Sequence, residues 1–307
     1  MKVVYDIYNY TPVPCVATIG SFDGVHCGHR AILGELRASA NEKGLPLMVI
    51  TFARHPRLMF DGECEPFILT TNSEKLELLE SVGADICVFL DFDSCMASMS
   101  ARRFMEEVLV SRLGVQCLAV GYDHHFGKPC EGEGLPEYIS YGKELGIEVF
   151  GAKPFEKNGR AISSSAVRRA LEAGEAALAA ELLGYRYSLC GRVVQGEGIG
   201  RSLGFPTANI LVDEPLKMVP ANGVYEVAVQ VGERNCKGVM NIGVRPTVGE
   251  NLMRTLEVHL LDFEGDLYGA DIKVELLRRL RGEHVFDNFE ALRFQIEVDV
   301  ARVRRGI

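Results

Sequence analysis

Residues 18–29 read TIGSFDGVHCGH, and this stretch decides the fold of the first half of the chain. A strand-like run ends at Gly20, and a helix-like run begins around two histidines, His26 and His29. Histidines three residues apart share one face of a helix, and interleaved glycines let an anion approach the backbone closely. Two interpretations are open from this stretch alone: a site for an anion such as phosphate, or an ordinary helix start with two incidental histidines.

Strand-like and helix-like runs alternate from residue 14 to about residue 155. The expected strands are 14–20, 45–52, 84–92, 115–122 and 147–155, and the expected helices are 28–43, 70–83, 100–114 and 136–146. Ser73 and Ser100 are the expected N-caps of two of these helices. Such alternation predicts a parallel, doubly wound, Rossmann-like sheet that binds its ligand beyond the carboxyl ends of the strands.

The pattern of the sequence changes after Gly184. Residues 162–184 are predicted to form two helices, broken at Gly174. Glycine-rich turns then separate strand-like runs: YSLCGRVVQG, NGVYEVAVQV, CKGVMNIGV, TLEVHLLD and IKVELLRRL. These runs indicate an all-β antiparallel barrel or sandwich. We therefore expect two domains, residues 1–184 and residues 185–307.

A last helix is expected near the end of the chain, where apolar residues follow helical spacing. These are Phe289, Leu292, Ile296, Val300 and Val303. The stripe that they form predicts that the helix packs on the β domain.

The charge of the chain bears on its partners. The net charge is −9, and residues 1–184 carry 25 acidic against 17 basic side chains. A nucleic-acid partner would favour a basic face, so this balance argues against one. Small anionic substrates remain compatible, because local loops can bind phosphate inside an acidic protein.

The cysteines bear on the compartment. Nine of them are scattered along the chain without a Cys-x-x-Cys pair. This pattern predicts reduced thiols rather than disulfides or a zinc site. The start, MKVVYDIYNY, lacks the layout of a signal peptide, and no apolar run approaches about 18 residues. We expect a cytoplasmic protein without a membrane partner.

A second candidate for anion binding lies at residues 163–168, SSSAVR. Three serines before a helix can simply cap it, which leaves Arg168 solvated. The other interpretation is that the hydroxyls and the arginine bind a phosphate chain at the helix N-terminus.

A glycine-rich segment opens the second half of the chain, where residues 196–209 read GEGIGRSLGFPTAN. Glycines alone suit an ordinary hairpin connection, but such a loop can also lay its amides over phosphates. Thr207 and Asn209 are two apart on a strand and point the same way, which suits an oxygen-ligated Mg²⁺. Farther on, Glu257 stands between Leu256 and Val258. It faces solvent, or it shares a partly enclosed face with a neighbouring histidine and suits general-base work.

The first half resembles the nucleotidyltransferase superfamily, in the form found in bacterial FAD synthetases. FDGVHCGH and ISSSAVR carry the resemblance, with TFARHP and LTTNSEK between them. The resemblance implies that His26, His29 and Arg168 act on the ATP phosphates as catalytic residues. It implies further ATP contacts from Gly20, Phe22, Asp23, Gly28, Ser164 and Ser165.

Residues 185–307 are similar to riboflavin kinase along essentially their whole length, through GFPTAN, GVYEVAV, NIGVRPT and LEVHLLDFEGDLYG. This implies a six-stranded antiparallel β-barrel with a closing helix and Glu257 as catalytic base. It also implies an ATP site formed by Gly196, Gly198, Gly200, Arg201, Thr207 and Asn209. The last two, Thr207 and Asn209, would also bind Mg²⁺. Asp123 and Arg245 are the flavin-side candidates.

Together the two halves resemble the family of bifunctional riboflavin kinase/FAD synthetases of bacteria. The resemblance implies phosphorylation of riboflavin to FMN and adenylylation of FMN to FAD, both with ATP. The chain departs from the family pattern at His125, where arginine is usual, at 129–132, where PCEG replaces a basic segment, and at Arg54, where proline is expected. Two alternatives therefore remain: a riboflavin kinase with a weakened adenylyltransferase domain, and a flavin-binding module without turnover, against which the retained kinase residues argue.

Overall fold

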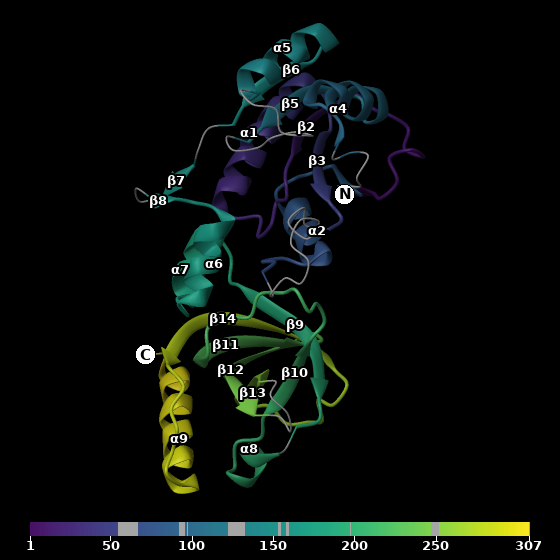
Figure 1. Ribbon diagram of the computed structural model, residues 1–307. Coiled ribbons are helices and arrows are strands. Elements are labelled where there is room, and N and C mark those ends of the chain that lie inside the picture. The colour runs from purple at the N-terminus through teal and green to yellow at the C-terminus, as the bar shows by residue number, and fades with distance from the viewer. Residues whose placement is uncertain are drawn as a thin grey trace. The chain divides into compact units, whose positions relative to one another are not determined.

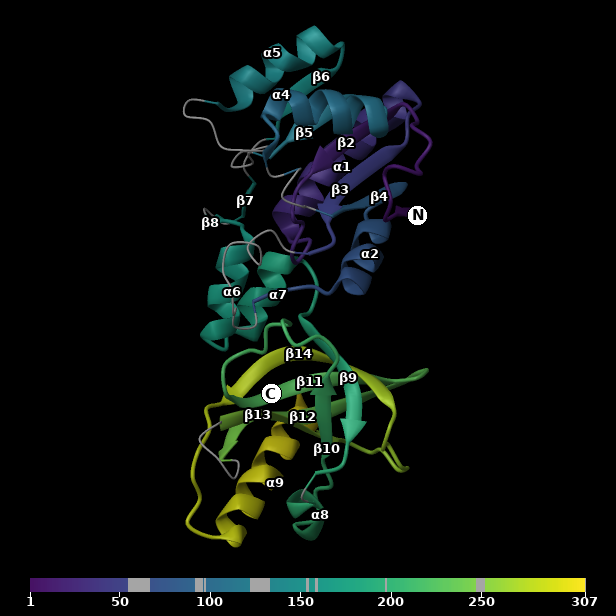
Figure 2. The same cartoon turned by 45° about the vertical axis from the view of Figure 1, so that its right-hand side comes forward.

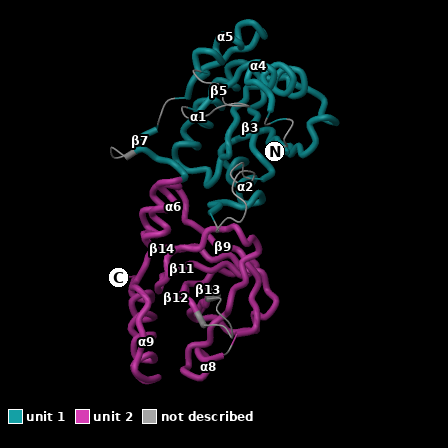
Figure 3. Tube along the Cα trace, in the orientation of Figure 1, with its two compact units in different colours: residues 1–164 teal, residues 165–307 magenta. Residues whose placement is uncertain are grey.

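The computed structural model of the chain describes residues 1–54, 67–91, 96, 98–121, 133–152, 155–157, 160–196, 198–246 and 252–306. Its contacts divide the chain into two compact units, Met1–Ser164 and Ser165–Ile307 (Figures 1 and 3). This division falls earlier in the chain than the predicted functional boundary after Gly184.

The first unit is built on a six-stranded parallel sheet. Its strands are β1 (Lys2–Val4), β2 (Cys15–Ile19), β3 (Leu47–Phe52), β4 (Ile86–Leu90), β5 (Val115–Val120) and β6 (Glu148–Gly151). The spatial order is β1-β4-β3-β2-β5-β6, so β2 lies between β3 and β5. The strand order reverses beside β2, and open α/β sheets bind ligands at such a reversal. The predicted parallel sheet is confirmed, with β1 as an edge strand that the sequence pattern did not predict.

Helices connect the strands of the first unit. They are α1 (Cys27–Lys43), α2 (Asn72–Ser81), α4 (Ala101–Phe104), the π-helix η2 (Met105–Arg112) and α5 (Leu135–Leu145). Ser100 caps α4 as predicted, because its hydroxyl accepts from the Arg103 amide. The prediction that Ser73 caps α2 is wrong. Thr71 caps this helix in a reciprocal capping box with Glu74, which satisfies two backbone amides at once. A small sheet of β7 (Glu156–Lys157) and β8 (Arg160–Ala161) follows β6.

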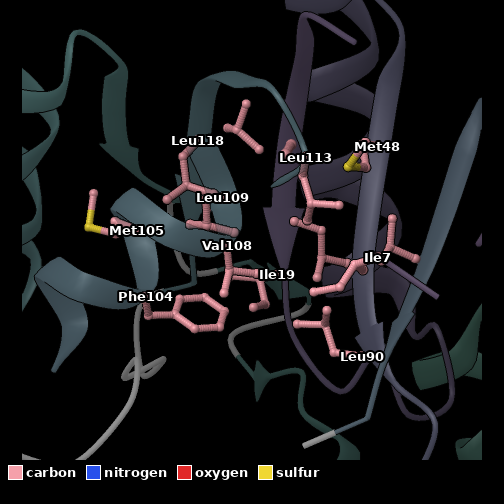
Figure 4. Packing of buried hydrophobic residues seen from close by; sticks show 14 of the residues in the cluster. Ile7, Ile19, Met48, Leu90, Phe104, Met105, Val108, Leu109, Leu113 and Leu118 are labelled. Atoms are coloured by element: carbon pink, nitrogen blue, oxygen red, sulfur yellow. The ribbon is translucent and has the colours of Figure 1, made fainter. Parts of the chain in front are cut away.

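Apolar side chains cover both faces of the parallel sheet. On one face Ile19 and Met48 pack with Phe104 and Leu109 of α4 and η2 (Figure 4). On the other face Leu33 of α1 belongs to a separate cluster with side chains of α2, β3 and β4. Strands β2, β3 and β4 are buried at every residue, as expected of a sheet with helices on both sides.

The second unit contains a closed barrel of six antiparallel strands (Figure 2). They are β9 (Ser188–Val194), β10 (Ala208–Val212), β11 (Gly223–Val231), β12 (Arg234–Pro246), β13 (Leu252–Leu260) and β14 (Asp271–Arg281), in the order β10-β13-β12-β11-β14-β9. The structure thus selects the barrel over the sandwich. Helices α6 (Ser164–Glu172) and α7 (Ala176–Leu183) precede it and are broken at Gly174, whose φ is 75°, as predicted.

Two further helices flank the barrel, the short α8 (Ile199–Ser202) and the closing α9 (Phe289–Arg305). Val300 and Val303 of α9 are buried against Val224 and Val239 of the barrel, which confirms the predicted packing. The N-terminal end of the predicted stripe does not pack, because Phe289 is 66% exposed in the first turn of the helix. Among the described residues, no helix has the length and hydropathy needed to cross a bilayer.

Candidate active sites

The loop between β2 and α1 has an unusual backbone conformation. Phe22, Gly24 and Val25 all have positive φ, of 46°, 81° and 34°. A β-branched residue rarely adopts such a φ, which costs on the order of 1–3 kcal/mol and persists only where the surroundings enforce it. Val25 is fully buried. The packing of this loop therefore enforces the turn that brings the chain from the end of β2 to the start of α1.

Asp23 anchors this loop from inside. Its buried carboxylate accepts hydrogen bonds from the backbone amides of Leu69 (2.9 Å) and Thr70 (3.1 Å). The Gly24 amide donates in turn to the Thr70 hydroxyl (3.0 Å). The carboxylate thus ties the loop to the segment before α2, and the predicted contact of Asp23 with ATP stays a prediction.

The two histidines of the motif lie together at the start of α1. His26 is the N-cap residue, and its Nδ1 accepts from the His29 amide at 3.3 Å. Because Nδ1 accepts, the neutral His26 ring carries its proton on Nε2. The two rings are stacked with centroids 3.7 Å apart, and the Phe22 ring packs on His29 at 4.9 Å. His26 is therefore both a helix cap and one of two adjacent imidazoles.

The His29 ring is neutral at physiological pH. Burial lowers its pKa well below the usual 6.5, and His26 and Lys75 lower it further. The buried Nδ1 of His29 has no hydrogen-bond partner among the residues that the structure describes. A neutral imidazole can still donate one N–H group. The pair can therefore offer directional donors to an anion without the cost of burying a charged imidazolium.

Lys75 is a further residue near this site that the sequence motifs do not indicate. It lies in the first turn of α2, it is 6% exposed, and its Nζ is 3.5 Å from the hydroxyl of Thr51 at the end of β3. Thr51 donates to the carbonyl of Ser21, in the loop after β2 (3.0 Å). The one signal in the sequence is the i, i+4 spacing to Leu79, since these two residues form the buried face of α2.

The glycines of this loop permit close approaches. A Cβ on Gly28 would lie 3.2 Å from the His26 ring and 3.5 Å from the carbonyl of Ile162. A Cβ on Gly20 would lie 3.3 Å from the Phe22 ring. Gly28 thus lets the His26 ring and the chain just before α6 approach the helix start.

The serine motif meets the histidine motif through Ser164. Its hydroxyl donates to the Asp23 carbonyl at 2.8 Å, across 141 residues of sequence. Ser165 and Arg168 lie on α6 and belong to the second unit. Their contact with the same ATP stays a prediction. Asp123 and the departures at His125 and 129–132 lie outside the described residues, whereas Arg54 is exposed in the bend after β3.

The second candidate site begins at the glycine loop between β9 and β10. A Cβ on Gly196 would clash with the Asn209 amide, and one on Gly200 with the Phe205 carbonyl and the Thr207 hydroxyl. Gly198 has a φ of 73° and caps the start of α8. At each of these three positions the backbone conformation or a close contact favours glycine. Together the glycines let the loop lie directly against the PTAN segment, residues 206–209.

The barrel register aligns polar residues beside this loop. Glu257 on β13 is directly opposite Asn209 on β10 and Asn241 on β12. Directly opposed residues in antiparallel strands share a face, so all three side chains point outward. Leu256 and Val258 face the barrel core and are buried. Asn241 could not be identified as a neighbour of Glu257 from the sequence, because the register of β12 and β13 cannot be read from either strand alone.

Thr207 lines two neighbouring cavities, and Glu257 lines one of them beside it. The Oε2 of Glu257 accepts from the Thr207 hydroxyl at 3.3 Å. Glu257, Thr207 and Asn241 line one cavity of 340 Å³, together with Phe205 and other apolar side chains. Thr207 also lines a neighbouring cavity of 340 Å³ beside Arg201. A phosphate donor in one cavity and an apolar acceptor in the other would meet at Thr207 and Glu257.

An ion pair closes the far side of the Glu257 cavity. Arg281, at the end of β14, donates through Nε to Asp299 on α9 at 2.9 Å. Asp299 is 1% exposed and also accepts from Gln295. Both Arg281 and Asp299 line the cavity, so they fix α9 against its wall. Arg245, a predicted flavin contact, pairs with Met253 in the β12–β13 ladder, and its side chain lies outside the description.

The donors at the second site suit a hard cation. Among the described residues, no three His, Cys, Asp or Glu side chains gather as a metal cluster. Thr207, Asn209 and Glu257 instead offer a hydroxyl, an amide and one carboxylate at neighbouring positions. These donors fit Mg²⁺, which prefers oxygen and takes most of its ligands from water and substrate phosphates.

Comparison with protein families matches both halves of the chain. The model of FAD synthetase matches residues 9–166, and the model of riboflavin kinase matches residues 183–307. The bifunctional riboflavin kinase/FMN adenylyltransferase of Escherichia coli K12 is 42% identical, over 99% of this chain and 97% of that protein. The protein of the same name from Bacillus subtilis is 36% identical, over 92% of this chain and 90% of its own length.

A solved structure from Streptococcus pneumoniae has a similar fold, with a TM-score of 0.89 and 27% identity over 98% of both chains. It carries the description of a macrolide-efflux protein. A shared fold does not by itself establish a shared function, because function depends on the residues of the site. The matches to both family models and the near full-length similarity to bifunctional enzymes show that the chain belongs to the family of bifunctional riboflavin kinase/FMN adenylyltransferases.

Proposed function

We propose that the protein converts riboflavin to FMN at the barrel site and FMN to FAD at the parallel-sheet site, each time with ATP. The observation that carries this function is the presence of two separate nucleotide-type sites in one chain. In one unit Thr207 lines two cavities and contacts Glu257, and in the other His26 and His29 lie at the strand-order reversal. Both family models match, so nothing favours the kinase-only alternative.

In the kinase step, the cavity beside Arg201 would take ATP and the cavity with Glu257 would take riboflavin. Glu257 accepts the proton of the terminal ribityl hydroxyl while that oxygen attacks the γ-phosphorus and ADP leaves. Thr207 fixes the carboxylate through its hydrogen bond. Catalysis in such reactions is mainly positioning and charge stabilisation. Mg²⁺, held by Thr207, Asn209 and the phosphates, would supply neutralisation of the phosphate charge.

In the adenylyltransferase step, a phosphate oxygen of FMN attacks the α-phosphorus of a second ATP. The bond to the bridging oxygen breaks and pyrophosphate leaves. The imidazoles of His26 and His29 donate N–H groups toward the phosphates, and the donation strengthens as charge develops on the leaving group. Arg168 would bind the triphosphate from α6. No protein nucleophile is needed, because the attacking oxygen belongs to the substrate.

The domain boundary, the flavin-side residues, the partners and the location also belong to this proposal. The adenylyltransferase part is residues 1–184 and the kinase part is residues 185–307, with Asp123 and Arg245 on the flavin side. The partners are small molecules, with no nucleic acid, and the location is cytoplasmic. Burial raises the pKa of the Cys15 and Cys87 thiols to about 12, which keeps them protonated and unreactive.

The test is a product analysis. Purified protein is incubated with riboflavin, ATP and Mg²⁺, and the flavins are separated by chromatography; FMN and then FAD should accumulate. A second reaction starts from FMN, so that only the adenylyltransferase step is read. A third contains excess chelator and should give neither product. FMN without FAD in the first reaction, and no FAD in the second, would establish the kinase-only alternative.

A further inference from the structure

Lys75 is a buried cation beside the histidine site that forms no ion pair with the described side chains. Its long hydrogen bond to Thr51 is the one that its ammonium makes among the described residues, and no carboxylate there lies within 4.0 Å of Nζ. An ammonium has three donors and is strongly hydrated in water. Burial of an ammonium with a single long hydrogen bond is costly, because the protein does not replace the water contacts that the charge loses. The contacts of this α2 side chain at the end of β3 therefore bear on its function in the site.

The contacts of Lys75 lead to the loop that carries the motif. The Thr51 hydroxyl, which Lys75 contacts, donates to the Ser21 carbonyl (3.0 Å). Ser21 precedes Phe22, the first residue of the loop with positive φ. The chain of contacts therefore joins α2, the end of β3 and the strained turn. Loss of these contacts would release the turn next to Phe22, where the backbone conformation is unfavourable.

We propose that Lys75 is a positioning residue for the FMN adenylyltransferase reaction, whose buried ammonium orders the loop after β2 through Thr51 and sets the charge beside the His26–His29 pair. The proposal rests on the function proposed above. Lys75 would not need to touch the substrate, because it acts on the groups that do. The histidines would supply directional donors, and Lys75 the fixed charge.

The charged and titratable groups around Lys75 agree with this role. Burial lowers the pKa of Lys75, and the nearby Asp23 carboxylate opposes this shift by favouring the charged form. On α1, His29 is held neutral by burial, by His26 and by Lys75 itself. On α2, the neighbouring Glu74 accepts from the Thr71 amide in the capping box. Removal of the Lys75 charge should therefore make His29 easier to protonate.

The first measurement is FAD formation from FMN across pH, with no riboflavin present. In Lys75→Met, kcat/KM for ATP should fall by about ten- to a hundredfold, as is typical for loss of a supporting residue. The acid limb of the pH profile should move to higher pH. Lys75→Arg keeps the charge and should recover most of the rate. Lys43→Met is the matched control: this exposed lysine of α1 pairs with Glu148 at the surface, and the variant should behave as wild type.

The second measurement does not depend on turnover. The pKa of His29 is followed by NMR of the imidazole in the ligand-free protein, and Lys75→Met should raise it. Thr51→Val removes the link to Ser21 but keeps the charge, so it should lower the rate of FAD formation while leaving the His29 pKa unchanged.

A folded Lys75→Met protein with an unchanged His29 pKa and wild-type FAD kinetics would overturn the inference. If that variant does not fold, Lys75→Arg and Thr51→Val decide: wild-type kinetics in Thr51→Val would remove the link through Ser21. Absence of FAD formation in the wild type would instead refute the proposed function. The NMR result would still decide whether Lys75 sets the charge at His29.

Discussion

At the scale of the residue, both sites depend on side chains held by contacts that a close substitute would not make. Glu257 is useful because Thr207 donates to it and because the barrel register turns it outward. His26 is useful because its Nδ1 is occupied by the His29 amide, which leaves the proton on Nε2. The following two predictions test these arrangements.

Glu257→Gln should lower FMN formation from riboflavin by about 10²–10⁴-fold, since the amide cannot accept the ribityl proton. FAD formation from supplied FMN should persist, because the histidine site lies in the other unit. Both rates are measured on one preparation by flavin chromatography. Loss of both activities in a folded variant would contradict the assignment of two sites.

His26→Asn tests the histidine donor without loss of the helix cap. Asparagine caps helices well, whereas alanine at this position would also cost about 1 kcal/mol of stability. FAD formation should fall by about 10²–10³-fold with either substitution, as is typical when a preorganised donor is lost. His29→Ala and Arg168→Ala should lower the same rate. Wild-type FAD formation in all of these variants, at saturating ATP, would refute their proposed action on the phosphates.

At the scale of the element, short loops between strands and helices carry both sites, and glycines set how closely those loops pack. In the second unit the loop from β9 to α8 lies against Asn209 and Thr207, and only a residue without a Cβ fits at Gly196 and Gly200. In the first unit Gly28 performs the same function beside the His26 ring. The glycines thus place backbone amides, which are the groups that would bind phosphates.

Gly196→Ala and Gly200→Ala should each raise the KM for ATP in riboflavin phosphorylation, because the new methyl group must displace Asn209 or the Phe205–Thr207 segment. A displacement of about 1 Å near reacting groups can cost about 10²-fold in rate. Gly34→Ala in α1 is the control. Nothing lies within 4 Å of its Cβ position, so this variant should gain about 0.5–1 kcal/mol of stability without a change in kinase rate. Unchanged ATP kinetics in both loop variants would show that the loop does not pack on the nucleotide.

At the scale of the whole molecule, two separate cores allow two reactions to be supported independently. The parallel sheet buries its strands between helices on both faces, and the barrel closes on itself and is covered by α9. The stability of the first unit is coupled to its site, because the half-buried His29 is neutral in the folded protein.

The first unit should lose stability as the pH falls below about 6.5, the pKa of an unfolded histidine. The pKa of His29 in the folded protein is lower, so in the window between the two values the unfolded chain binds a proton that the folded chain does not. Stability therefore rises with pH through that window and is fully present above it. Hydrogen exchange of α1 amides at about pH 7.5 and about pH 5 measures this, and His29→Gln should reduce the difference. An equal pH effect in His29→Gln would assign it to other groups.

The sequence by itself determined the features that local patterns encode. Alternation of strand and helix signals predicted the parallel sheet, period-2 runs with glycine turns predicted an antiparallel β domain, and the motifs located His26, Glu257 and Thr207. The two fold predictions are confirmed because propensity and periodicity act over a few residues, whereas the roles of these three site residues stay predictions. The strand pattern alone left the choice between barrel and sandwich open, the resemblance to riboflavin kinase predicted the six-stranded barrel that is observed, and Ser73 was mistaken for the cap that Thr71 provides.

Only the tertiary structure decided what depends on pairing between distant segments. The strand order places β2 at the centre, the register sets Asn241 beside Glu257, and the Ser164 hydroxyl reaches the Asp23 carbonyl across 141 residues. Lys75 shows the physical reason most clearly. A lysine in a helix pattern is expected at the surface, and its burial follows from β3 and α2 packing together, a long-range balance of free energies that no local pattern records.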